Sequence, residues 1–332
     1  AYNLTGALSS IDAPGANGAK LAAKEINETG GVLGRPIELA GYDSKSDTAT
    51  VANVVTQMVE TDKVIAVVGY NDSDSVLAAA PITQAAGLPF LTPGATSPKL
   101  PEQAGDLVYL VPFGDNVQAA VAAEYAYAHL GQSAYLLIDQ AAEYTTLLGQ
   151  YFKQRYEELG GKILLADTYQ SGDTNFAAQT AKVKALDPQP DLLFISAMPD
   201  DVGTVVRQFR EAGLMQPIVG GDGYDTNLLV EVGGNAAENV YFTTHALMDP
   251  ELGTQPVQDF IAAYSAEYGH PPENVFAALG YDGIKLLANA IERAWSTDPG
   301  AIREALGTTQ NFETVTGSIS YNDGAHIPDK SV

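Results

Sequence analysis

The sequence predicts an α/β fold with two lobes built on parallel sheets. Short apolar segments rich in β-branched residues alternate with segments of helical periodicity, which is typical of parallel strands joined by helices. This alternation runs to about residue 115 and then restarts, so two blocks of similar size follow each other. With 332 residues, the chain is long enough for two separate hydrophobic cores.

The first block ends near Phe113. Its apolar segments, such as Val64–Val68, have the length of one buried strand, and a helical segment ends at Gly87. The predicted strands are Tyr2–Ala7, Ile37–Tyr42, Val64–Val68, Pro89–Leu91 and Val108–Val111. The predicted helices are Asn17–Glu28, Thr48–Glu60 and Ser73–Ala86, and Leu8–Ala16 is expected to be a loop.

The second block repeats the pattern. The predicted helix Tyr144–Leu159, for example, closes at the glycine pair Gly160-Gly161, which favours a helix end. The predicted strands are Ala134–Ile138, Lys162–Tyr169, Leu192–Ser196, Pro217–Gly220 and Val240–Thr244. The predicted helices are Asn116–Leu130, Tyr144–Leu159, Phe176–Leu186 and Val202–Ala212.

After His245 the pattern changes to helices with no strand between them. Because these helices need a sheet to cover, we expect them to return to the first lobe; they are Val257–Tyr268, Val275–Ala294 and Pro299–Leu306. Ser318–Tyr321 is strand-like and is followed by an Asn-Asp-Gly hairpin signal.

The chain is therefore expected to pass between its lobes several times. The predicted division places residues 1–115 and 247–316 in an N-terminal lobe, and residues 116–246 and 317–332 in a C-terminal lobe. Such crossings make a hinge, and the cleft between two lobes is the usual place for a ligand.

Composition excludes several classes of function. The net charge is −24, from 41 acidic against 17 basic residues, which argues against nucleic acid and anionic membrane surfaces as partners. No apolar run approaches the roughly 18 residues that span a bilayer. Cysteine is absent, which excludes disulfides, a thiolate metal site and a cysteine nucleophile. No leader is recognisable, so either the protein is cytoplasmic or a leader has been removed.

Ser73 and Thr96 follow two neighbouring predicted strands. Both are expected at the carboxyl edge of a parallel sheet, where ligands of open α/β sheets bind. The start of the helix at Ser73, with Asp72 beside it, suits a carboxylate, and so do Ala95 and Thr96 in the next turn. The alternatives are an ordinary helix cap and an ordinary turn. Asp72-x-Asp74 lacks the glycine and glutamate of a calcium loop, so no metal site is predicted.

Asp222 lies among glycines after the strand Pro217–Gly220. Glycine on both sides lets the backbone approach a ligand closely, so Asp222 is a candidate counter-ion for an ammonium group, or else a solvated turn residue. Together with the hydroxyls of the first lobe, this acid predicts a zwitterionic ligand. Tyr144, Tyr224 and Phe276 lie near strand ends or helix starts, where they either line a side-chain pocket or pack in the core.

Signatures of enzymes are missing from the sequence. It contains no P-loop, GxGxxG, GxSxG or HExxH motif, and its four histidines are scattered without metal-ligand spacing. We therefore expect a binding protein without a cofactor, not an enzyme.

Several motifs, taken in order, resemble one known family. The chain is similar to the type I periplasmic binding proteins of the leucine/isoleucine/valine-binding family, the receptors of amino-acid ABC importers. The segments that carry the resemblance are Asn17–Ala22, Glu25–Asn27, Gly30-Gly31, Tyr42-Asp43, Val67–Gly69, Pro93–Pro98, Gly220–Gly223 and Tyr281–Gly283.

The resemblance implies two Rossmann-like, three-layer αβα lobes with three crossovers that close around the ligand. It implies that Ser73, Ala95 and Thr96 hold the ligand carboxylate, that Asp222 holds the ammonium and that Tyr144 packs on the ligand. The family's best-known members differ, because they have Glu in place of Asp222, an aromatic residue near Ala197 and a small disulfide. The shorter acid and the missing ring leave more room, so leucine specificity is not implied.

The expected function is that of an extracytoplasmic receptor for an L-amino acid with an aliphatic or small side chain. The resemblance implies a periplasmic location or a lipid anchor, a membrane permease as partner and a monomer. Two alternatives remain at this stage. One is a receptor for an aromatic or other organic carboxylate or an amide, and the other is a sensory ligand-binding domain.

Overall fold

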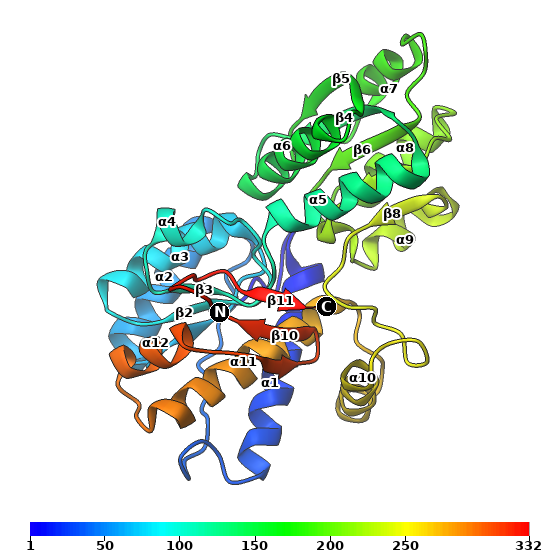
Figure 1. Ribbon diagram of the computed structural model, residues 1–332. Coiled ribbons are helices and arrows are strands. Elements are labelled where there is room, and N and C mark those ends of the chain that lie inside the picture. The colour runs from blue at the N-terminus through cyan, green and yellow to red at the C-terminus, as the bar shows by residue number, and fades with distance from the viewer. Residues whose placement is uncertain (332) are drawn as a thin grey trace. The chain divides into compact units, whose positions relative to one another are not determined.

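The computed structural model describes residues 1–331 and shows an α/β chain with two compact units (Figure 1). Unit 1 contains Ala1–Phe113 and the chain from His245 onwards, and unit 2 contains Gly114–Thr244. The chain passes between the units at Phe113–Gly114 and again at Thr244–His245. The described chain therefore has two crossings, whereas the resemblance implied three.

Unit 1 has a parallel sheet in the order β1-β2-β3, with β1 at Val67–Val68, β2 at Phe90–Thr92 and β3 at Val108–Leu110. The predicted strands Tyr2–Ala7 and Ile37–Tyr42 do not form as strands. Only an isolated parallel bridge joins Tyr2 to Asp43. The extended pairing cannot continue, because Gly6 has φ +90° and helix α1 begins at Ser9.

Helix α1 is the largest difference from the sequence-based prediction in unit 1. It spans Ser9–Glu28 and includes the segment expected to be a loop, with Pro14 inside it. Its partner is α11, Val275–Ala294, and the two backbones approach closely where a Cβ on Gly18 would lie 1.8 Å from the carbonyl oxygen of Ala277. Packing against α11 therefore stabilises helical turns that local propensity disfavours.

Except for α4, the remaining helices of unit 1 follow the prediction closely. They are α2 Thr48–Gln57 (extended by a π-helical turn, η1, Met58–Asp62), α3 Ser73–Ala85, α4 Leu100–Ala104, α10 Gln255–Tyr268 and α12 Pro299–Gly307. The short helix α4 was not predicted. The helices after His245 return to the first unit, as expected, because α11 packs on α1 and α12 packs on α11.

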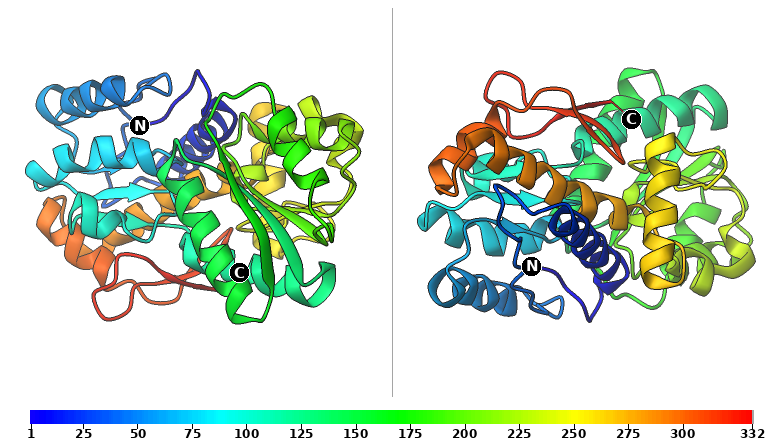
Figure 2. Two further views of the ribbon diagram at one scale, coloured as in Figure 1. Left: turned by 90° about the horizontal axis from the view of Figure 1, so that it is seen from above. Right: turned by 90° about the horizontal axis from the view of Figure 1, so that it is seen from below.

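The tail after α12 lies in unit 1, not in the second lobe. It forms an antiparallel sheet in the order β11-β10-β9, from β9 Phe312–Thr314, β10 Gly317–Ser320 and β11 Asp329–Ser331 (Figure 2). Tyr321 Oη donates to the carbonyl of Leu110 at 2.7 Å, and Lys330 Nζ donates to that of Val111 at 3.2 Å. The predicted placement of residues 317–332 in the C-terminal lobe is therefore wrong for the described part. The hairpin signal after β10 is confirmed, because β10 and β11 pair antiparallel.

Unit 2 contains a five-stranded parallel sheet in the order β5-β4-β6-β7-β8. Its order reverses between β4 and β6, the point at which ligands of doubly wound sheets usually bind, at the carboxyl ends of the strands. The strands are β4 Ser133–Asp139, β5 Lys162–Tyr169, β6 Leu192–Ser196, β7 Ile218–Gly220 and β8 Val240–Phe242. The helices are α5 Asp115–Tyr125 (continued by the π-helical turn η2, Ala126–Leu130), α6 Glu143–Glu158, α7 Ala177–Lys184, α8 Val202–Glu211 and α9 Leu228–Gly233. Two 3₁₀ turns are η3 Asp222–Tyr224 and η4 Gly234–Ala237.

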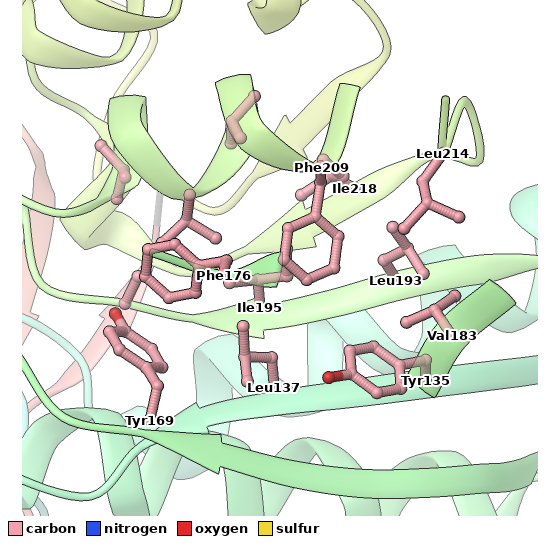
Figure 3. Close-up of a cluster of buried hydrophobic side chains, with 14 of the residues drawn as sticks. Tyr135, Leu137, Tyr169, Phe176, Val183, Leu193, Ile195, Phe209, Leu214 and Ile218 are labelled. Atoms are coloured by element: carbon pink, nitrogen blue, oxygen red, sulfur yellow. The ribbon is translucent and has the colours of Figure 1, made fainter. Parts of the chain in front are cut away.

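The core of unit 2 explains why its strands were predicted well. Alternate residues of β4 face opposite sides of the sheet, and Tyr135 and Leu137 pack on the side shown in Figure 3 with Phe209 of α8. On the other side, Phe152 of α6 stacks on Phe194 with ring centroids 3.7 Å apart. Because both faces are covered, every residue of β6 is buried, and the sequence shows a continuous apolar run.

Candidate functional site

Ser73 and Thr96 belong to two loops of unit 1 that meet at the carboxyl edge of its sheet. Ser73 is the first residue of α3 and is 1 % exposed, and Thr96 lies in the turn after β2 and is 2 % exposed. The N–H of Ser97 donates to Ser73 Oγ at 3.4 Å, which brings the two loops together. We call Asp72, Ser73, Ala95 and Thr96 the hydroxyl cluster of unit 1.

Asp72 is the N-cap of α3. Its Oδ1 accepts the N–H of Ser75 at 2.8 Å, and its Oδ2 lies 3.4 Å from Asn3 Nδ2. Burial raises the pKa of Asp72 to about 6, against the hydrogen bonds from Ser75. The capping role explains why the sequence has an acid here without any appeal to a ligand.

The turn after β2 is held by the Thr92 hydroxyl. Thr92 Oγ1 donates to the carbonyl of Tyr70 at 2.8 Å and accepts the N–H of Ala95 at 2.9 Å. The Ala95 N–H, which the sequence assigned to an anion, is thus engaged inside the turn. The hydroxyls of Ser73 and Thr96 are the polar groups of this pair of loops that best suit an external carboxylate.

A second buried acid, Asp12 of α1, supports the hydroxyl cluster. Asp12 accepts the N–H of Asn3 at 2.7 Å and that of Asn71 at 3.0 Å. Burial raises the pKa of Asp12 to about 8, and the neighbouring Asp72 carboxyl adds to the rise. Asp12 thereby fixes the backbone that leads into Asp72 and Ser73.

Unit 2 contains a second polar cluster around Asp222. Asp222 begins the turn η3 directly after β7 and is 2 % exposed. Gln118 Nε2 donates to Asp222 Oδ1 at 3.0 Å and to Asp115 Oδ1 at 2.9 Å. Gln118 Oε1 accepts the N–H of Asp222 at 3.1 Å. We call Asp115, Gln118, Tyr144 and Asp222 the acidic cluster of unit 2.

Tyr144 joins this group from the first turn of α6. Its hydroxyl accepts the N–H of Gly223 at 3.0 Å. Burial raises the pKa of Tyr144 well above its usual value, and the carboxylates of Asp222 and Asp115 raise it further. The phenol therefore stays protonated and neutral beside two acids.

The two other aromatic candidates belong to different surroundings. Tyr224 belongs to the same buried hydrophobic cluster as Tyr135, and its hydroxyl donates to the carbonyl of Ile195 at 3.0 Å, so it packs in the core of unit 2. Phe276 lies in the first turn of α11 in unit 1, where it is 1 % exposed. Its N–H donates to Asn274 Oδ1 at 3.1 Å, in the cap of that helix.

Sequence reasoning missed Asp115 and Gln118. Both lie in the first turn of α5, three residues apart, so their side chains share one face of the helix. An Asp-x-x-Gln pair at the start of a helix after a crossing is a weak signal. What identifies it is the contact with Asp222, which is 104 residues away in the chain.

Neither a metal site nor a membrane span is found in the part of the chain that the structure describes. Among residues 1–331, no three His, Cys, Asp or Glu side chains are grouped so that they could hold a metal ion. No helix in the same range is both long and apolar enough to cross a membrane.

Comparison with known proteins identifies the family of the chain. The family profile described as periplasmic binding protein matches residues 1–332. The leucine-, isoleucine-, valine-, threonine- and alanine-binding protein of Pseudomonas aeruginosa is 26% identical over 306 residues, which cover 92% of this chain and 80% of that protein.

Two crystal structures are more similar in sequence. The leucine-binding protein LivK of Thermotoga maritima is 33% identical and has a TM-score of 0.90, with 99% of this chain and 91% of that chain covered. The branched-chain amino-acid substrate-binding protein LivJ of Streptococcus pneumoniae, in complex with isoleucine, is also 33% identical with a TM-score of 0.90, covering 97% and 90%. The resemblance noted in the sequence is confirmed, and the chain belongs to the periplasmic binding protein family.

Proposed function

We propose that this protein is the solute-binding receptor of an ABC importer and that it binds an L-amino acid with an aliphatic or small side chain. The hydroxyl cluster of unit 1 is assigned to the ligand carboxylate, and the acidic cluster of unit 2 is assigned to its ammonium. The similar proteins support this choice, because one binds leucine, isoleucine, valine, threonine and alanine, and another is complexed with isoleucine.

The observation that carries the proposal is the pair of carboxylates on one amide in unit 2. Asp115 and Asp222 are both buried, and Gln118 donates a hydrogen bond to each. Carboxyl oxygens of two buried acids in one cluster suit a ligand that brings a hydrogen-donating cationic group, such as an ammonium. A carboxylate ligand without an amino group would bring only more negative charge.

Both ends of such a ligand contribute to affinity through charge-assisted hydrogen bonds. Each bond of this kind is worth roughly 1.5–3 kcal/mol. Ser73 and Thr96 supply neutral donors to the carboxylate, and Asp222 supplies an acceptor to the ammonium. The Tyr144 ring is assigned to contact with the ligand, and the small buried side chain of Ala197 leaves room for its aliphatic part.

The test is a thermal-shift and calorimetric screen of purified protein. We expect stabilisation by L-leucine, L-isoleucine, L-valine, L-threonine or L-alanine, since a ligand at 100 times its dissociation constant adds about 2.7 kcal/mol. 4-Methylpentanoate, which is leucine without its amino group, should bind far more weakly. Benzoate and 3,4-dihydroxybenzoate complete the screen, and stabilisation by these alone would overturn the amino-acid assignment.

Asp222→Asn provides the paired experiment. It should weaken the binding of the amino acid roughly 10- to 150-fold, which is the loss of one charge-assisted hydrogen bond, and leave 4-methylpentanoate almost unchanged. Asp173→Asn, at an exposed position of the same unit, controls for the change in net charge. Equal losses for both ligands would remove the ammonium assignment.

Three further parts of the proposal concern the whole molecule. The receptor works outside the cytoplasm as a monomer, which light scattering would show as a mass near 34.9 kDa. It delivers its ligand to a membrane permease, so ligand-loaded protein should stimulate the ATPase activity of the reconstituted importer. It does not transform the ligand, so mass spectrometry should recover the amino acid unchanged.

A further inference from the structure

Gln118 lies next to both places at which the chain passes between the units. It belongs to the first turn of α5, shortly after the crossing at Phe113–Gly114. Its Oε1 also accepts a hydrogen bond from Thr243 Oγ1 at 2.7 Å. Thr243 immediately precedes the second crossing at Thr244–His245. One buried side chain therefore contacts both crossing segments and Asp222.

Every hydrogen-bonding position of the Gln118 amide is occupied. Its two Nε2 hydrogens go to Asp115 and Asp222, and its Oε1 accepts from the Asp222 backbone and from Thr243. A primary amide offers two donors and one oxygen with two lone pairs, so no position remains. A flip of the amide, which exchanges Oε1 and Nε2, would place its hydrogens against donors and its oxygen against two carboxylates. Its orientation, and with it that of Asp222, is fixed.

We propose that Gln118 is a positioning residue that links the ammonium-binding acid to the two crossing segments. It holds the Asp222 carboxylate in one orientation, and a change at Asp222 on ligand binding is transmitted through the same amide to Thr243. Ligand binding and the ordering of the crossing segments are then coupled. This inference rests on the proposed function, because it gives Asp222 the role of binding the ligand.

The chemistry of the position favours glutamine over its isosteric acid. Glutamate at 118 would add a third carboxylate to Asp115 and Asp222, and its ionised form could donate to neither. A protonated glutamate could donate one hydrogen bond again. The carboxyl groups of Asp115 and Asp222 beside it would raise the pKa of the introduced glutamate, so it should take up a proton as the pH is lowered.

The first test compares Gln118→Glu with Gln118→Met for binding of L-leucine between pH 5 and pH 8. For Gln118→Glu we expect a loss of about 10- to 100-fold at pH 8 relative to the native protein, with most of the affinity restored at pH 5. For Gln118→Met we expect a similar loss at every pH, because methionine donates no hydrogen bond. The same loss at every pH in both variants would indicate a merely structural role and overturn the inference.

The second test uses Thr243, which keeps the inference testable if a Gln118 variant does not fold. Hydrogen exchange should show that L-leucine protects amides of residues 240–246 in the native protein. Thr243→Ser keeps the hydroxyl and should keep this protection, whereas Thr243→Val should lose it. Equal protection in both variants would show that this hydrogen bond transmits nothing.

The outcomes separate this inference from the function on which it rests. If no amino acid binds the native protein, the proposed function fails and the inference fails with it. If amino acids bind and Asp222→Asn weakens them, but Gln118→Glu and Gln118→Met bind as the native protein does, only the inference is overturned. A double variant of Gln118→Met and Asp222→Asn that is no weaker than Asp222→Asn alone supports action through Asp222.

Discussion

The hydroxyl of Thr92 accepts the backbone N–H of Ala95 at 2.9 Å, inside the turn that follows β2. The same hydroxyl donates to the carbonyl of Tyr70 at 2.8 Å, directly before Asn71 and the cap of α3. One buried side chain thus fixes the two loops of the hydroxyl cluster of unit 1 against each other. The positions of Ser73 and Thr96 depend on it.

Thr92→Val should destabilise the protein and weaken carboxylate binding together. Valine has nearly the shape of threonine but leaves a buried N–H and a buried carbonyl without partners, at a cost of about 1–3 kcal/mol each. Urea unfolding and calorimetry with L-leucine measure the two effects. Thr92→Ser keeps the hydroxyl and should retain most of both; unchanged affinity in Thr92→Val would show that the turn does not position the site.

Ser73→Ala should lower affinity without much loss of stability. The hydrogen bond that Ser73 Oγ accepts is long, at 3.4 Å, so its removal should change the free energy of unfolding by less than about 1 kcal/mol. L-Leucine and 4-methylpentanoate should lose affinity by a similar factor, because both have the carboxylate. Ser75→Ala, which removes one acceptor of Asn3 Nδ2, is the structural control and should affect stability only. A loss confined to L-leucine would place Ser73 elsewhere on the ligand.

Tyr144→Phe should reduce affinity for the amino acid. The phenylalanine ring fills the same space, but the buried N–H of Gly223 beside Asp222 loses its acceptor, which costs about 1–3 kcal/mol. Tyr156→Phe on the same helix loses a hydrogen bond to the carbonyl of Gly131 and serves as the control. Both variants should be less stable in urea, and only Tyr144→Phe should bind L-leucine more weakly. Equal affinities would remove Tyr144 from the ligand site.

Asp72→Asn should change the pH dependence of stability. The folded state raises the pKa of Asp72 to about 6, above the unfolded value near 3.9, so it holds the proton more tightly than the unfolded chain. The free energy of unfolding of the native protein should therefore fall as pH rises from about 4 to 6, by about 2–3 kcal/mol from this group. Asparagine can still cap α3 but does not titrate, so the variant should lose this part of the decline.

Asp47→Asn is the matched control for that experiment. Asp47 caps α2 with the same geometry but is exposed, and the hydrogen bonds from Thr50 lower its pKa. Its contribution has the opposite sign, since it is present at neutral pH and is lost as pH falls. Thermal unfolding at several pH values distinguishes the two variants. A decline between pH 4 and 6 that persists in Asp72→Asn would show that another group, such as Asp12, causes it.

Much of the fold could be predicted from the sequence where local pattern and tertiary environment agree. Strand β6 was located residue for residue, because both its faces are buried and its apolar run is uninterrupted. The ends of α11 were also predicted, since Asn274 caps it and its apolar stripe is long. The candidate residues Ser73, Thr96, Asp222 and Tyr144 could be proposed from the sequence because each follows the carboxyl end of a predicted strand, and their role in binding stays a prediction.

The sequence by itself determined the α/β alternation and the polar residues at the strand ends, because these depend on periodicity and on capping within a few residues. Only the tertiary structure decided that α1 begins before Pro14, that Tyr321 and Lys330 tie the tail to unit 1, and that Gln118 reaches Asp222. Each of these depends on contacts between segments far apart in the chain. Local propensity has no information about such partners. Their burial stabilises α1 although it contains Pro14, and their hydrogen bonds hold the amide of Gln118 between two carboxylates.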